Sequence, residues 1–225
     1  MTAGNEGQGT PKLEGGRKAT VDRILQEEWA QFQAVNNVGG PASCQSMPNT
    51  FALMRSAQFS AWTDAMVASY EDDLFQAKAA GRNLMTEKYG YMMEETDPEY
   101  YHRVLEPRFP KTSEEARGII EEILAQNRAW EQEVHERYPF VAARARRAEG
   151  ASGGGLASVD VYARGELRTY SLRTLRLYRE LVRDAVGEGR NLALEERAAI
   201  ARGYGCKTLE ELESKLAASD AARER

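Results

Sequence analysis

A short frame of residues occurs twice in this chain, and this repeat constrains the fold more than any other feature. Tyr70 stands eleven residues before a Gly-Arg-Asn-Leu run at 81–84, and Tyr178 stands at the same distance before the same run at 189–192. Four consecutive identities within a matching frame predict an ancient duplication of one helical unit. Two such copies are expected to pack about a pseudo-twofold axis, because their equivalent apolar faces can bury each other. The same offset pairs Trp62 with Tyr170, Ala77 with Ala185 and Glu87 with Glu195.

Apolar residues recur every three or four positions along most of the chain, which is the spacing of one face of an α-helix. No stretch shows the alternation that predicts a strand. The pattern therefore predicts an all-α protein, a single helical bundle built from two pseudo-twofold-related halves. The expected helices cover 19–35, 50–56, 58–79, 83–94, a segment starting at Pro98, 113–138, 162–187, 191–204 and 208–216.

Turn-forming and polar segments divide the chain. Residues 1–18 are rich in Gly and polar side chains, so we expect a disordered leader there. The helical domain is expected over 19–216, with half one at about 19–111 and half two at about 112–206. The end of the chain, 217–225, is expected to fray.

Composition excludes several classes of protein. With 30 basic and 35 acidic residues the net charge is −5, so nucleic acid is not an expected partner. No run approaches the roughly 20 apolar residues that span a bilayer, and no signal peptide is evident, so no membrane partner is expected. Two cysteines form at most one disulfide, which favours a reduced cytoplasmic protein. A homodimer is left open.

The chain carries a set of distinctive motifs: the run 35–45, Arg55, Gln58, Trp62, Ser69-Tyr70, the run 81–84, Lys88-Tyr89, Met92-Met93, the run 164–167 and Tyr170-Ser171. Together these motifs resemble an uncharacterised bacterial family, domain of unknown function 4125, and the resemblance extends from about Ile24 to Leu212. It implies no established activity, but the Ala- and Arg-rich composition is typical of a high-GC bacterial source, where a place in a biosynthetic pathway is plausible.

Cys44 and Gln45 lie in a loop broken by Gly and Pro, ahead of an expected helix. Backbone N–H groups at a helix start lower the pKa of a thiol, so Cys44 is a candidate nucleophile. It would need a base from elsewhere in the fold, such as His102 or His135. The alternative is a buried cysteine that acts as a small apolar residue.

The repeated Arg-Asn pairs, Arg82-Asn83 and Arg190-Asn191, place a guanidinium fork beside an amide. Such a pair suits a carboxylate or a phosphate. The structural alternative is that Asn caps the following helix while Arg pairs with an acid. Both copies keep the motif, although a catalytic site needs only one, so the structural alternative is favoured.

Positions at which the two copies differ are the better functional candidates. Lys88 and Tyr89 make the first post-repeat helix richer in groups that can act as acid or base. Their counterparts are Glu196 and Arg197, and Glu166 corresponds to Gln58. The catalytic candidates are Cys44, Lys88, Tyr89 and Glu166. The substrate-binding candidates are Gln45, Arg55, Gln58, Arg82, Asn83, Arg164, Arg190 and Asn191.

Three further patterns bear on metal, diphosphate and polyanion binding. Glu99 and His102 have the Glu-x-x-His spacing of di-iron proteins, but the chain has only two histidines, so no metal ligand is assigned. An acidic run at 71–73 resembles a magnesium diphosphate motif and is more typical of a solvated face. Arginines along 164–183 are interleaved with acids, which favours local ion pairs.

The sequence therefore predicts a small-molecule enzyme that acts on a small carboxylate-bearing substrate in a cleft between the halves. No cofactor is predicted, and deprotonation, elimination or isomerisation, as in a lyase or isomerase, is the expected chemistry. One alternative is a non-catalytic helical interaction module. The other is an oxidase that depends on iron or heme.

Overall fold

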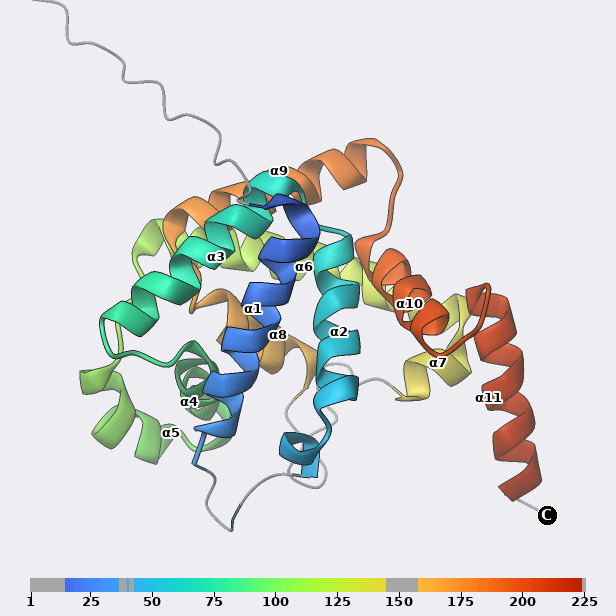
Figure 1. Cartoon of the computed structure of the whole chain (residues 1–225), viewed down its shortest axis with the longest axis horizontal. Helices are drawn as coiled ribbons and strands as arrows, with labels where there is room; N and C mark the ends of the chain where they lie inside the picture. The colour runs from blue at the N-terminus through green and yellow to red at the C-terminus, as the bar shows by residue number, and fades with distance from the viewer. Residues whose placement is uncertain (1–14, 37–39, 41–42, 145–157, 224–225) are drawn as a thin grey trace, which may run out of the picture.

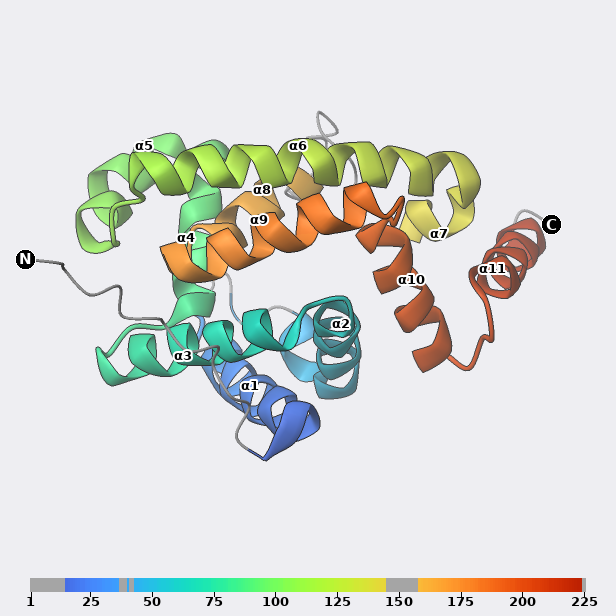
Figure 2. The same ribbon diagram turned by 90° about the horizontal axis from the view of Figure 1, so that it is seen from above.

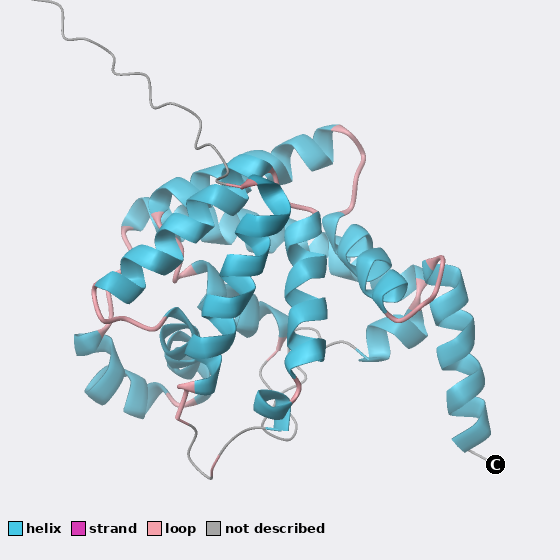
Figure 3. Ribbon diagram, viewed as in Figure 1, coloured by secondary structure: helices cyan, strands magenta, loops and turns pink. Residues whose placement is uncertain are grey.

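The computed structural model describes residues 15–36, 40, 43–144 and 158–223, and within them the chain is helical with no strand (Figures 1 and 3). The predicted all-α class is confirmed. The expected leader, apart from its last residues, lies outside the described residues. The first four helices are α1 (Gly16–Gln33), α2 (Pro48–Ser60), α3 (Asp64–Ala79) and α4 (Leu84–Thr96). After α5 (Pro98–Tyr100) follow α6 (Glu114–Arg137), α7 (Pro139–Arg144), α8 (Val159–Leu167), α9 (Leu172–Gly187), α10 (Leu192–Gly203) and α11 (Leu209–Arg223).

The long helices stack in a fixed order. Figure 2 shows α6 beside α9, then α3, then α1, and these neighbours pack on one another. Two further contacts cross between the parts of the chain, because α4 packs against α8 and α10 packs against α2. Each of these pairs joins a helix of 19–111 to a helix of 112–206, so the two parts share one core.

The repeated Gly-Arg-Asn runs adopt the same local structure. Gly81 and Gly189 have φ values of 70° and 68°, in the left-handed region that glycine enters without a steric cost. The side chain of Asn83 accepts from the Thr86 N–H, and that of Asn191 accepts from the Leu194 N–H, so each asparagine caps the next helix.

Two helices predicted as continuous are each broken in two. The expected helix at 58–79 is interrupted after Ser60, and the one at 162–187 is interrupted after Leu167. The reason is the same at both breaks. The hydroxyl oxygens of Thr63 and Ser171 accept hydrogen bonds from backbone N–H groups of the next helix, so each residue caps the start of a new helix.

The C-terminal segment also differs from the prediction of a frayed tail. Helix α11 continues through Arg223 instead of ending at Leu216. Arg144 of α7 forms an ion pair with Asp220, which ties this last part of α11 to the body of the protein. Together with α7 and α10, α11 encloses a small apolar cluster around Val141, Ala201 and Leu209.

Aromatic rings fill the centre of the main core. The Trp62 ring lies 6.0 Å from both the Tyr170 and the Tyr178 rings, and Tyr70 lies 5.1 Å from Tyr170. Ile24 of α1 and Ile123 of α6 are completely buried beside them. This apolar shell surrounds the polar cluster that forms the candidate site. No helix in the described part of the chain combines the length and apolar character needed to cross a membrane.

Candidate functional site

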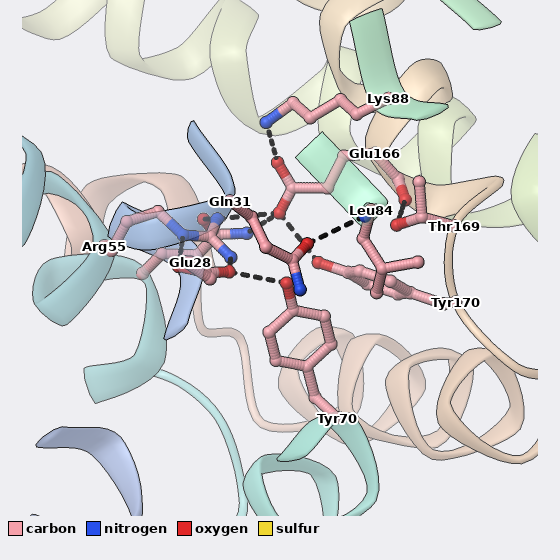
Figure 4. A network of polar contacts seen from close by, with 10 residues as sticks. Glu28, Gln31, Arg55, Tyr70, Leu84, Lys88, Glu166, Thr169 and Tyr170 are labelled. Atoms are coloured by element: carbon pink, nitrogen blue, oxygen red, sulfur yellow. Dashed lines mark hydrogen bonds and ion pairs between the residues drawn. The ribbon is translucent and has the colours of Figure 1, made fainter. Parts of the chain in front are cut away.

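Four charged side chains meet inside the helical core, where burial makes an unpaired charge very costly. They are Glu28 of α1, Arg55 of α2, Lys88 of α4 and Glu166 of α8, with residue exposures of 0%, 7%, 3% and 8%. Figure 4 shows them converging with the hydroxyls of two tyrosines. We call these four residues with Gln58, Tyr70 and Tyr170 the core cluster.

Glu166 is the hub of the core cluster. Its Oε1 accepts hydrogen bonds from Arg55 Nη1 at 2.8 Å, from Gln58 Nε2 at 3.0 Å and from the Tyr170 hydroxyl at 2.7 Å. Its Oε2 pairs with the Lys88 ammonium. Lys88 also lies over the Tyr162 ring, with 3.6 Å between Nζ and the ring centroid. The carboxylate is therefore held from α2, from α4 and from the turn between α8 and α9 at once.

Glu28 forms the second anionic centre. Arg55 donates to both of its oxygens, with Nε 2.8 Å from Oε2, and this fork is the strong bidentate geometry for a guanidinium. The Tyr70 hydroxyl donates to Oε1 as well. The Arg55 guanidinium lies 4.7 Å from the centroid of the Phe59 ring. Arg55 thus links the two carboxylates, and the four charges balance.

The charges fix the protonation of the core cluster. Burial opposes ionisation of Glu166, but Arg55 and Lys88 outweigh it and hold the pKa of this carboxyl well below its usual range. Burial and the adjacent carboxylates raise the pKa of Tyr70 and Tyr170 well above that of a free phenol. Both tyrosines therefore remain hydroxyl donors at neutral pH.

Glu196 of α10 is close enough to the core cluster for the charge of Glu166 to affect its pKa. Burial raises its pKa, and the Glu131 and Glu166 carboxylates add to that rise against the opposing charge of Arg197. Arg197 lies 3.4 Å from Glu196 and donates to Glu131 at 2.9 Å. Nevertheless 32% of the Glu196 side chain is exposed. Glu196 thus combines a perturbed carboxyl with access to solvent, which is a common property of catalytic acids and bases.

The structure brings four of the sequence-predicted residues together: Arg55, Gln58, Lys88 and Glu166. Figure 4 shows Arg55, Lys88 and Glu166 of this set. Tyr89 lies outside this set and packs its ring 6.2 Å from Phe32 and 6.4 Å from Tyr162.

The loop candidates lie away from the core cluster. Gln45 is buried and donates to the carbonyl oxygens of Phe32 and Val35, so it closes the end of α1. Cys44 is an exposed free thiol, in contrast to the buried position of the structural alternative. Its role as a nucleophile stays a prediction.

Both repeated arginines are engaged by a carboxylate five residues away. Arg82 donates through Nε and Nη2 to Glu87, and Arg190 donates in the same way to Glu195. Hydrogen bonds to these acids raise the pKa of both arginines. Arg164 is engaged by Glu121 and Asp160 on the outer side of α8. The side chains of Arg82 and Arg190 remain 38% and 39% exposed, and the role of all three arginines in substrate binding stays a prediction.

The structure also gives the positions of the residues in the candidate metal and diphosphate patterns. His102 contacts Glu106, and no group of three or more His, Cys, Asp or Glu side chains in the described ranges is arranged to hold a metal. In the acidic run, Glu71 pairs with Arg23 and Asp73 accepts from Thr174. These acids therefore serve contacts between helices.

Sequence analysis did not identify Glu28, Tyr70, Tyr170 and Glu196 as site residues. The available signal for Tyr70 and Tyr170 was their place in the repeated frame, and for Glu196 it was its correspondence to Lys88. Glu28 gave no signal, because an acid on an amphipathic helix is usually solvated.

The chain belongs to the family described as "Protein of unknown function (DUF4125)", whose family model matches residues 18–214. No curated protein matches the chain. No solved structure matches it either.

Proposed function

We propose that this protein is a small-molecule enzyme that uses acid–base chemistry at the boundary between the core cluster and Glu196. One observation carries the proposal: two carboxylates of one region have pKa values shifted in opposite directions. Glu166 is held ionised by Arg55 and Lys88, whereas Glu196 binds its proton more tightly than a free glutamate. Carboxylates whose surroundings separate their pKa values are typical of enzymes that need an acid and an anion in one site.

The residues have different roles in this proposal. Glu196 transfers the proton, because its side chain combines a raised pKa with contact with solvent. Glu166, fixed by four donors, keeps the local field constant while Glu196 changes charge. Arg197, which pairs with Glu131 and Glu196, is the cation that opposes the rise in the pKa of Glu196. Deprotonation, elimination or isomerisation without a cofactor is the corresponding reaction class.

We also propose that the two halves arose by duplication and pack about a pseudo-twofold axis. The matched glycine φ values and asparagine caps support this origin. So does the exchange of partners, in which α4 packs on α8 and α10 packs on α2. Under this relationship Lys88 and Glu166 correspond to Glu196 and Gln58, so the ion pair of Lys88 with Glu166 has no counterpart at the related position. Acid–base function is assigned to Glu196, which occupies the position of the lysine in that ion pair.

A second candidate is a non-catalytic interaction module in which the core cluster only joins the halves. One observation favours it: within the described part of the chain, Arg179 Nε is the single buried side-chain donor or acceptor without a hydrogen bond. A fully satisfied polar core is what a purely structural network requires. The bacterial cytoplasm is the proposed setting in either case, because two free cysteines are ordinary in a reducing compartment.

Proton exchange with solvent tests the enzyme proposal without knowledge of the substrate. The protein is incubated in D2O with pools of small carboxylic and amino acids, and loss of C–H signals or new products are followed by proton NMR. We expect wild type to catalyse exchange or conversion of one class of compound and Glu196→Gln to lose that activity. The exposed Glu180→Gln is the matched control and should remain active. Equal activity in Glu196→Gln would refute the assignment, and an inert wild type would favour the interaction module.

A further inference from the structure

Arg179 on α9 differs from the other arginines of that helix. Its Nε is buried without a hydrogen-bond partner, and it forms no ion pair within the described part of the chain. A buried donor is normally satisfied, so an unpaired one calls for an explanation. The neighbouring arginines reach carboxylates on other helices: Arg173 pairs with Asp72, Arg176 with Glu115 and Arg183 with Glu122.

Arg179 lines a groove between α6 and α9 with a volume of about 250 Å³. Val182 and Val186 provide the apolar surface along it, and Val186 is 49% exposed, whereas Ile123 is completely buried. The polar lining is Glu122, Gln126, Arg179 and Arg183. The groove therefore combines an unsatisfied guanidinium with hydrocarbon, and this combination suits an anion that carries a short apolar tail.

The corresponding position in the first half is closed. There Arg23 of α1 donates to Glu71 of α3 at 2.6 Å. In the repeat, Arg179 stands at the position of Glu71. Asn83 donates to the main-chain oxygen of Gln31, and Asn191 donates to that of Trp130, so these two residues of α1 and α6 correspond. By the same offset, Glu122 of α6 stands at the position of Arg23 of α1. In the second half the acid and the arginine have exchanged helices: the acid is Glu122 of α6, and the arginine is Arg179 of α9. Glu122 pairs with Arg183 at 2.9 Å, so the ion pair between Glu122 and Arg179 that would close the groove is not formed.

We propose that this groove binds a small carboxylate with a short aliphatic tail. The carboxylate lies against the guanidinium of Arg179 and accepts hydrogen bonds from its terminal amino groups, which, unlike Nε, are not enclosed by the protein. The tail lies on Val182 and Val186. This site is separate from the core cluster, and it does not depend on the proposed acid–base function.

The test is an amide NMR titration of the full chain with sodium acetate, butyrate and hexanoate at constant ionic strength. We expect saturable shifts confined to the amides of 122–126 and 179–186, with tighter binding as the tail lengthens. Arg179→Gln should weaken butyrate binding by about tenfold or more, which corresponds to the loss of one charge-assisted contact. Arg176→Gln, whose arginine is paired outside the groove, is the matched control and should bind as wild type does.

Glu122→Gln gives a second measurement that keeps the arginine in place. It removes the carboxylate that competes for the groove, so butyrate binding should become stronger. The proposal is overturned if none of the three anions gives saturable shifts, if Arg179→Gln binds butyrate as well as wild type, or if Glu122→Gln weakens binding. Inorganic phosphate that binds as tightly as hexanoate would also overturn it, because the apolar surface would then contribute nothing.

Discussion

Replacing Glu166 by Gln tests whether the core cluster stabilises the fold as its geometry implies. The change keeps the volume of the side chain but removes the charge that Arg55 and Lys88 share, and both cations are less than 10% exposed. Glu28 alone then faces two buried cations. Removing one member of a buried, hydrogen-bonded ion pair costs about 3–5 kcal/mol in the free energy of unfolding. At about 2–4 °C per kcal/mol for a protein of this length, the midpoint of thermal unfolding should fall by about 6–20 °C.

The pH dependence of this difference has a defined direction. The folded-state pKa of Glu166 lies well below the ordinary value of 4.5, so its ionised form stabilises the protein. This stabilisation is fully present above the ordinary value, and it is lost as the pH falls through the folded-state pKa. Urea unfolding followed by circular dichroism should therefore show a large difference between wild type and Glu166→Gln at pH 7. The difference should shrink in strongly acidic solution.

An exposed ion pair provides the control for this experiment. Glu115 pairs with Arg176 at 2.7 Å, and the two side chains are 49% and 50% exposed. Because solvent screens such a pair, Glu115→Gln should cost less than about 1 kcal/mol. If Glu166→Gln costs no more than this control, the buried charges are not coupled as described. Adding Lys88→Met to Glu166→Gln restores charge balance and should recover at least about 1 kcal/mol of the loss.

Further predictions concern helix packing, caps and Glu196. A Cβ at Gly165 would lie 2.7 Å from a main-chain oxygen of α4, so Gly165→Ala should destabilise the fold by about 1–3 kcal/mol. Gly118→Ala, in open space on α6, should stabilise it by about 0.5–1 kcal/mol in the same urea titrations. Asn83→Ala and Asn191→Ala should each cost about 1 kcal/mol, because each removes one helix cap. The raised pKa of Glu196 favours its protonated form, so wild type should lose stability relative to Glu196→Gln as the pH rises above 4.5. Unfolding curves of that pair between pH 4 and 8 check the sign.

Periodicity and the repeat were sufficient to predict the class of the fold and most of its helices. Apolar spacing finds a helix because the side chains of one face must be buried together. It did not find the breaks at Thr63 and Ser171, since a hydroxyl residue at a cap does not interrupt the apolar period. Sequence spacing also could not give the pairing of α4 with α8 or of α10 with α2, which depends on how the two halves meet.

The candidate site was predicted only in part, because sequence patterns do not show which side chains of different helices meet. The family motifs contain Arg55, Gln58, Lys88 and Glu166, so these residues could be selected from the sequence. Glu28 could not, because its burial depends on Arg55 reaching α1 from α2. The roles assigned to Arg82 and Arg190 depended on whether an acid would occupy their guanidinium forks. Glu87 and Glu195 supply those acids only once the preceding glycine has turned the chain.

The distribution of charge gives the strongest reason to place proton chemistry at Glu196. In the core cluster two carboxylates face two cations, and every one of these four residues is less than 10% exposed. Across the corresponding helices of the second half, Glu131 and Glu196 share the single charge of Arg197. A partly buried region with one surplus negative charge lowers its free energy by binding a proton, and Glu196 is its more exposed carboxylate, at 32% against 24% for Glu131. This surplus charge is the feature on which we base the proposal that Glu196 takes up and releases a proton.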